Sequence, residues 1–165
     1  MKEKISIITV VKNGMPYLVD CIKSFQNQKY ENKEHIILVS KCNDNTVDYL
    51  KKNKFKNTKI FFFKKDIGLY KSLNEAVKFC KGYIIGYLHS DDVFFNNKIL
   101  NVISNNISEY DYTYGNILFV RRNNLDIKVR SWNYGAMNPL KKKKLFSSPP
   151  YIHVFSKKNF NKIKI

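Results

Sequence analysis

Two hydrophobic patterns alternate along the first ninety residues. Short continuous apolar runs predict strands buried on both faces, at residues 5–11, 35–40, 59–64 and 83–89. Apolar positions at helical spacing predict the intervening helices, at residues 16–28, 46–50 and 69–82. Strands and helices that alternate in this way indicate right-handed βαβ units, so we expect an α/β fold with a mostly parallel sheet flanked by helices.

The pattern is looser beyond Asp92. A short helix is expected near residues 98–107, followed by strands at 110–120 and 125–132 that a turn at residues 122–124 joins. Neither an internal repeat nor a Pro- or Gly-rich linker marks a second domain, so a single domain is expected over residues 1–165.

Two adjacent carboxylates, Asp91 and Asp92, follow the fourth predicted strand. Ligands of an open parallel sheet bind outside the carboxyl ends of its strands, where these residues would lie. Adjacent carboxylates raise each other's pKa unless a cation lies beside them, so a divalent metal bound to a diphosphate is a natural partner. An Asx-turn, or an N-cap for the segment near Asn96, would explain the pair without a ligand.

Charge and composition narrow the classes of partner. The 165 residues include 30 Lys and Arg against 13 Asp and Glu, a net charge of +17 that favours phosphates or a lipid headgroup surface. Three widely spaced cysteines indicate neither a zinc site nor a disulfide framework.

The apolar runs and the lysine clusters also suggest a location in the cell. No apolar run approaches the ~20 residues of a membrane span, and the first is too short for a signal peptide. We therefore expect a cytoplasmic protein whose membrane contact is peripheral, at the inner face of the cell membrane. Lys141–Lys144 and the lysine-rich end after Ser156 would make that contact with anionic lipid.

Several longer phrases resemble a known family. Residues 5–40 read as a strand, an Asn-containing turn, a helix ending in S-x-x-x-Q and a second strand, and residues 66–92 run from D-x-G-x-Y to S-D-D. The phrases "YGNILFV" and "PPYIHVF" follow. In this order the motifs resemble family 2 glycosyltransferases of the GT-A type, and in particular a bacterial subgroup that builds surface polysaccharides. The resemblance covers nearly the whole chain and implies a Rossmann-like fold.

The resemblance also implies an activity. Such enzymes transfer a sugar from a nucleoside diphosphate sugar to a glycan or lipid-linked acceptor, and inversion is expected here. Residues 1–92 would then form the nucleotide-sugar-binding half, and residues 93–165 a partial acceptor half of a catalytic unit that is incomplete at its C-terminus. The isolated chain is expected to bind donor weakly and to transfer sugar negligibly.

Individual site residues follow from the resemblance. Asp92 would coordinate Mn2+ or Mg2+ between the two phosphates, while Asp91 would share the metal or bind the ribose. His153 would lie near the acceptor or the metal. The residues expected around the nucleotide sugar are Thr9, Val11, Asn13, Ser40, Asp66, Gly68, Tyr70 and Lys71. Ordinary strand packing for Thr9 and His153, and turn geometry for Asp66 and Gly68, remain alternatives.

Two features depart from the family's pattern. The second strand ends in Val39-Ser40-Lys41-Cys42, where relatives usually carry an Asp that reads the base, and Asp44 matches a later Asp that caps the next helix. An inverting transferase also needs a general base. The only acidic residues after Asp92 are Glu109, Asp111 and Asp126, and none lies in a matching phrase.

Two alternatives remain open. An inactive nucleotide-binding protein that keeps this fold would account for a missing general base. A basic nucleic-acid-binding domain would account for the charge, but the chain lacks an RNP-like phrase, a zinc pattern and a helix-turn-helix signature. That domain would also leave the acid pair unexplained, so no nucleic-acid partner is expected.

Overall fold

The computed structural model describes residues 2–107, 112–132 and 153–156. Strands and helices alternate through the first half, as the hydrophobic pattern predicts. The elements, in chain order, are β1 (Ile5–Val11), α1 (Tyr17–Gln26), β2 (Lys33–Val39), α2 (Thr46–Lys52), β3 (Thr58–Phe62), α3 (Leu69–Val77), β4 (Ile84–Tyr87), α4 (Ile99–Asn106), β5 (Tyr112–Tyr114), β6 (Ile117–Arg121), β7 (Asn124–Trp132) and β8 (His153–Ser156).

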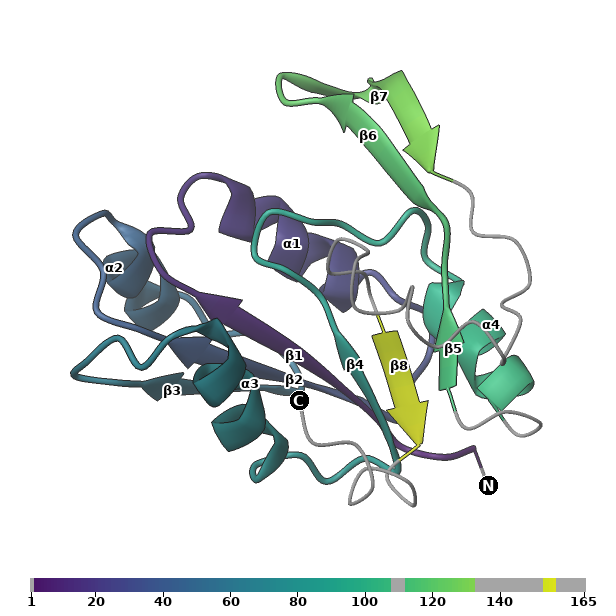
Figure 1. The fold of residues 1–165 in the computed structure, drawn as a ribbon, viewed down its shortest axis with the longest axis horizontal. Helices are drawn as coiled ribbons and strands as arrows, with labels where there is room; N and C mark the ends of the chain where they lie inside the picture. The colour runs from purple at the N-terminus through teal and green to yellow at the C-terminus, as the bar shows by residue number, and fades with distance from the viewer. Residues whose placement is uncertain (1, 108–111, 133–152, 157–165) are drawn as a thin grey trace, which may run out of the picture.

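The main sheet has the strand order β3-β2-β1-β4-β8-β5 (Figure 1). The first four strands are parallel, whereas β8 runs antiparallel to both β4 and β5. The strands β6 and β7 form a separate two-stranded hairpin that projects from the main body (Figure 1). The expected mostly parallel α/β sheet is therefore confirmed.

The two faces of β1 are buried against different helices. Successive side chains of a strand point to opposite faces. Ile5 and Ile7 pack in one cluster with side chains of α1 and α4, whereas Ile8 packs in another with Leu73 and Ala76 of α3. This burial on both faces explains why the run Ile5–Val11 contains no alternating polar positions. None of the described helices is long and apolar enough to cross a membrane.

The structure departs from the sequence predictions at several boundaries. The helix α3 ends at Val77, not Gly82, because the next amides, Lys78 to Cys80, donate to carbonyls three residues back and tighten the last turn. The helix α1 ends at Gln26, two residues early. The single strand predicted at 110–120 divides into β5 and β6 around Gly115 and Asn116, and β8 was not predicted.

Candidate functional site

The carboxyl ends of β1, β2, β3 and β4 meet at one edge of the sheet because these strands are parallel. The strand β8 also begins there, since it is antiparallel to β4 and its Val154 pairs with Gly86. The loops that carry the predicted site residues therefore converge on this edge (Figure 1).

The loops after β1 and β2 are joined by Asn13. Its side-chain oxygen accepts the backbone N–H of Asn43 at 2.8 Å, and its own N–H donates to the sulfur of Cys42 at 3.3 Å. Asn13 has a φ of 54°, a left-handed conformation that asparagine tolerates better than most residues. The asparagine thus shapes the turn that was expected to line the nucleotide site.

Two residues at the start of α2 support the same turn. Asp44 accepts the N–H groups of Met15 and Thr46 on its two carboxylate oxygens, at 3.0 and 3.1 Å. The hydroxyl of Thr46 accepts the N–H of Gly14 at 2.9 Å. Asp44 therefore makes a turn bond to the first helical amide and fixes the loop after β1, while the N-cap position itself is Asn45, whose side chain makes no capping hydrogen bond.

A second connection involves the loop after β3. The ammonium of Lys12 lies 2.7 Å from the carboxylate of Asp66, which also accepts the N–H of Gly68 at 2.9 Å. The hydrogen bond from Lys12, followed by that from Gly68, lowers the pKa of Asp66. Gly68 has a φ of 82°, and a Cβ added there would meet no atom within 4 Å. Backbone conformation, not crowding, therefore accounts for glycine at this position.

The acid pair lies on the turn that follows β4. Asp91 and Asp92 are both exposed, and the N–H of Asp92 donates to the carbonyl of His89 at 3.1 Å. Desolvation by the surrounding protein, and then the charge of Asp91, raise the pKa of Asp92. A cation beside the two carboxylates would relieve the repulsion between them.

The acid pair fits a divalent cation only with further ligands. Within the described ranges, no three or more His, Cys, Asp or Glu side chains are grouped so as to hold a metal ion. Mg2+ is usually held by one or two carboxylates together with waters and substrate phosphates, and carboxylate oxygens also suit Mn2+. Asp91 and Asp92 match this mode, in which the diphosphate completes the site.

Thr9 lies beneath the site and not at its surface. It is 0% exposed, and its hydroxyl donates to the carbonyl of Leu88 at 2.7 Å and lies 2.8 Å from Nε2 of His35. These bonds occupy the side chain within the core, so it offers no surface to a nucleotide. The expectation that Thr9 lines the pocket therefore needs correction.

The remaining predicted residues differ in exposure. Val11 and Ser40 are buried at the ends of neighbouring strands, where the N–H of Ser40 donates to the carbonyl of Val11 at 2.9 Å. Tyr70 and Lys71, in the first turn of α3, are exposed. His153 is the first residue of β8, at the same edge as the acid pair.

Other predictions fall outside the described residues. The expected membrane contact at Lys141–Lys144 and the lysine-rich end lies there, as do Glu109 and Asp111, two of the three acids after Asp92 that match no general-base phrase. The third of these acids, Asp126, lies exposed on β7.

Sequence reasoning missed three residues near this edge: Lys12, Cys21 and His35. A lysine directly after the first buried strand was a signal for Lys12. His35 and Cys21 read as ordinary strand and helix positions, because their polar partners come from distant segments.

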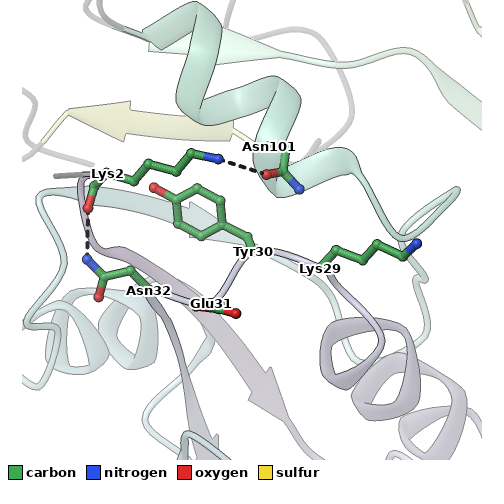
Figure 2. Close-up of a pocket in the computed structure, with 6 residues that line it drawn as sticks. All are labelled: Lys2, Lys29, Tyr30, Glu31, Asn32 and Asn101. Carbon is green, nitrogen blue, oxygen red and sulfur yellow. Dashed lines mark hydrogen bonds between the residues drawn. The ribbon is translucent and has the colours of Figure 1, made fainter.

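The hollow shown in Figure 2 lies at the opposite edge of the sheet, by the start of β1. It has a volume of about 550 Å³ and is lined by Lys2, Lys29, Tyr30, Glu31, Asn32 and Asn101. Two of its polar contacts are made within the lining, from Lys2 to Asn101 and from Asn32 to the carbonyl of Lys2 (Figure 2). It lies at the far end of β1 from the acid pair.

Comparisons with known proteins agree with this geometry. The chain is 34% identical over 103 residues to the Escherichia coli UDP-Glc:alpha-D-GlcNAc-diphosphoundecaprenol beta-1,3-glucosyltransferase WfaP, a match that covers 61% of this chain and 40% of WfaP.

Solved structures share the fold. Staphylococcus aureus TarS 1-349 in complex with UDP-GlcNAc has a TM-score of 0.75 at 18% identity, over 96% of this chain and 47% of TarS. The mannosyltransferase PcManGT from Pyrobaculum calidifontis, in complex with GDP-Man and Mn2+, has a TM-score of 0.68 at 13% identity, over 98% of this chain and 47% of PcManGT. The chain thus spans less than half the length of each of these three proteins.

The family described as "Glycosyl transferase family 2" matches residues 6–163, which is almost the entire chain. The match includes all four parallel strands and the acid pair at their carboxyl edge. This protein therefore belongs to glycosyl transferase family 2 and has the GT-A fold expected from its motifs.

Proposed function

We propose that this chain binds the donor in a glycosyltransferase that moves a sugar from a nucleoside diphosphate sugar to a glycan or lipid-linked acceptor, with inversion. The observation that carries the proposal is the exposed acid pair, Asp91 and Asp92, at the carboxyl end of β4 in a family 2 chain. The name of WfaP, a glucosyltransferase that acts on a diphosphoundecaprenol sugar, supports a lipid-linked acceptor and a role in polysaccharide biosynthesis. The UDP-GlcNAc bound to TarS supports a nucleotide-sugar donor.

Asp92 and Asp91 would hold Mn2+ or Mg2+ at the diphosphate of the donor. The Mn2+ in the PcManGT complex supports this choice of ion. A cation there would neutralise charge that develops on the leaving diphosphate. Asp91, which is exposed beside Asp92, would share the ion or bind the ribose.

The nucleotide would lie over the loops that follow β1, β2 and β3. Asn13 and Ser40 would approach the base or ribose, with Val11 beneath them in the core. Beside the diphosphate, Gly68 leaves open space above its backbone, and Tyr70 would lie next to it. The exposed ammonium of Lys71, together with Lys12, would attract phosphate by charge.

The acceptor would approach from the side of β8 and β5. His153 is placed on that side by the register of β8, next to the carboxyl end of β4. A general base would take the proton of the acceptor hydroxyl, and none of the acids after Asp92, which are Glu109, Asp111 and Asp126, matches the family's phrase for this role. Residues 1–92 then serve the donor and residues 93–165 the acceptor.

Metal-dependent binding of UDP and GDP to the 165-residue chain tests the proposal. Calorimetry should detect binding of one of these nucleotides with Mn2+ and much weaker binding without it. Asp92→Asn should weaken the metal-dependent binding by about tenfold or more. Glu31→Gln is the matched control, because Glu31 is an exposed acid at the opposite edge, and should have no effect. Unchanged metal-dependent binding by Asp92→Asn would show that the site is wrongly placed.

A further inference from the structure

A buried polar cluster lies directly beneath the acid pair. It contains Thr9 of β1, His35 of β2 and Cys21 of α1, and all three are 0% exposed. Thr9 and Cys21 bond the backbone carbonyls of Leu88 and His89, which precede the acid pair, and His35 bonds Thr9. Buried polar groups that bond to one another need an explanation beyond packing.

The hydrogen bonds of this cluster have a defined direction. The carbonyl of Leu88 can only accept, so the single hydroxyl proton of Thr9 is donated to it, at 2.7 Å. Thr9 must then accept from Nε2–H of His35 at 2.8 Å, which assigns the proton of the neutral imidazole to Nε2. Nδ1 of His35 then carries no proton to donate, and it has no hydrogen-bond partner in the described part of the chain.

Cys21 makes the second connection to the turn. Its thiol donates to the carbonyl of His89 at 3.3 Å, and the same carbonyl accepts the N–H of Asp92 at 3.1 Å. Burial raises the pKa of Cys21 to about 12, so the sulfur keeps the proton that it donates. The carbonyls of two successive residues, Leu88 and His89, are therefore held by buried side chains just before the acid pair.

We propose that Thr9, oriented by His35, and Cys21 are positioning residues for the Asp91–Asp92 pair. By fixing the carbonyls of Leu88 and His89, they set the direction in which the two carboxylates project from the end of β4. Residues that orient metal ligands from behind typically contribute a tenfold to hundredfold effect on metal affinity. The inference rests on the proposed function, since it assigns these residues to the same metal and diphosphate site.

Two quantities test the proposal. The first is the affinity for Mn2+ in the presence of UDP, measured from the electron paramagnetic resonance signal of free Mn2+. The second is the melting temperature without ligand. Thr9→Val removes the hydroxyl with little change of shape, and Thr9→Ser restores it. Ser6→Ala is a matched control on the same strand, because Ser6 is also 0% exposed and bonds the N–H of Gly82 at the other end of β4. Asp92→Asn tests the site itself.

Thr9→Val is expected to weaken Mn2+ binding by about tenfold while Thr9→Ser and Ser6→Ala leave it near the wild-type value. Equal losses of melting temperature for Thr9→Val and Ser6→Ala, with unchanged Mn2+ affinity in both, would overturn the positioning role. An unchanged affinity in Asp92→Asn would instead overturn the proposed metal site, so the two failures are distinguishable.

If Thr9→Val does not fold, Cys21→Ala tests the positioning role instead. This variant removes the bond to the His89 carbonyl and the long contact of the sulfur with the Thr9 hydroxyl at 3.9 Å, and it leaves the bonds of Thr9 to Leu88 and His35 in place. A weaker affinity for Mn2+ with UDP, at a melting temperature close to that of Ser6→Ala, supports the proposal. Wild-type affinity in Cys21→Ala would contradict it.

Discussion

The Lys12 ammonium and the Asp66 carboxylate form an ion pair at 2.7 Å across the end of β2. Lys12 follows β1 and Asp66 follows β3, and β2 lies between these strands in the sheet. The pair therefore joins two loops that share no strand pairing. Both side chains remain largely exposed, at 55% and 41%, so solvent screens their attraction.

Exchanging the charges of this pair tests whether it only holds the two loops together or also contributes to nucleotide binding. The double variant Lys12→Asp/Asp66→Lys keeps an ion pair, and its melting temperature should stay close to that of the wild type because exposed ion pairs contribute little to stability. We expect its affinity for UDP with Mn2+ to fall by about tenfold, since a lysine at position 66 cannot accept the N–H of Gly68, which lies beside the proposed diphosphate site. Wild-type affinity in the double variant would show that the pair holds the two loops together and does not contribute to nucleotide binding.

Mn2+ binding should depend on pH at values above those usual for aspartate. Desolvation, and then the charge of Asp91, raise the pKa of Asp92, and the protonated carboxyl is a poor metal ligand. Affinity for Mn2+ with UDP should therefore fall with decreasing pH before the ordinary Asp value of about 3.9 is reached. Asp91→Asn should move the midpoint to lower pH while weakening binding throughout, as calorimetry at a series of pH values can show. A midpoint that Asp91→Asn leaves unchanged would rule out coupling between the two carboxylates.

The same pKa makes a prediction for the metal-free protein. A carboxyl with a raised folded-state pKa binds its proton more tightly in the folded state, so ionisation of Asp92 opposes folding. Asp92→Asn should raise the melting temperature at neutral pH, and this gain should disappear as the pH falls below the unfolded value of about 3.9. A destabilised Asp92→Asn at neutral pH would show that the ionised carboxylate has a structural partner.

Glu34 should stabilise the amino-terminal edge of the sheet. It is a buried carboxylate that accepts bonds from Ser6 and the N–H of Lys81 and pairs with Lys59 at 3.2 Å. Burial is the largest influence and opposes ionisation, but these contacts together outweigh it and lower the pKa of Glu34. Glu34→Gln should reduce the free energy of unfolding by about 1–3 kcal/mol at neutral pH, as measured by urea denaturation.

The pH dependence of this effect provides its control. Because the folded-state pKa of Glu34 is lowered, its contribution is complete above the unfolded value of about 4.3 and is lost as the pH falls through the folded value. The difference between wild type and Glu34→Gln should therefore shrink in acid. Exposed Glu31→Gln should show no such difference at any pH. If the difference in unfolding free energy between wild type and Glu34→Gln persisted unchanged in acid, packing and not charge would be its cause.

His35 should limit stability in mild acid. Burial lowers its pKa to about 3, so the unfolded chain takes up a proton below the ordinary value of about 6.5 while the folded protein does not. Stability should fall as the pH decreases from about 6.5 towards 3. His35→Gln keeps an N–H donor for Thr9 and should lack this loss, whereas His89→Gln, at a half-exposed position, should retain it. Thermal melts over this range would contradict the prediction if His35→Gln and wild type declined in parallel.

The sheet edge could be predicted from the sequence because its causes are local. A continuous run such as Ile5–Val11 has no polar face, which indicates a strand buried on both sides in a parallel sheet. Asp91 and Asp92 directly follow the fourth such run. The depth of Thr9 could not be predicted in this way. It depends on His35 and Leu88, which lie 26 and 79 residues away in the chain.

The strand β8 illustrates the same limit. Its four residues, His153–Ser156, lie between β4 and β5 in the sheet, and all their pairing partners are distant in sequence. A four-residue segment carries too little periodicity to be told from a loop. By contrast, the β6–β7 hairpin could be predicted, because its turn residues separate two adjacent strands.

Side chains of β1 hold β4 at both ends. The hydroxyl of Ser6 accepts the N–H of Gly82 at 2.8 Å before the strand begins, and Thr9 bonds the carbonyl of Leu88 just after it ends. A Cβ at Gly82 would lie 2.6 Å from the backbone nitrogen of Ser6, which leaves no room for a shift at that end. One residue inserted or deleted between these points would break one of the two bonds and turn side chains to the opposite face. The number of residues in β4 therefore sets how far the carboxylates stand from the core, and length variation at this edge must fall outside residues 82–88.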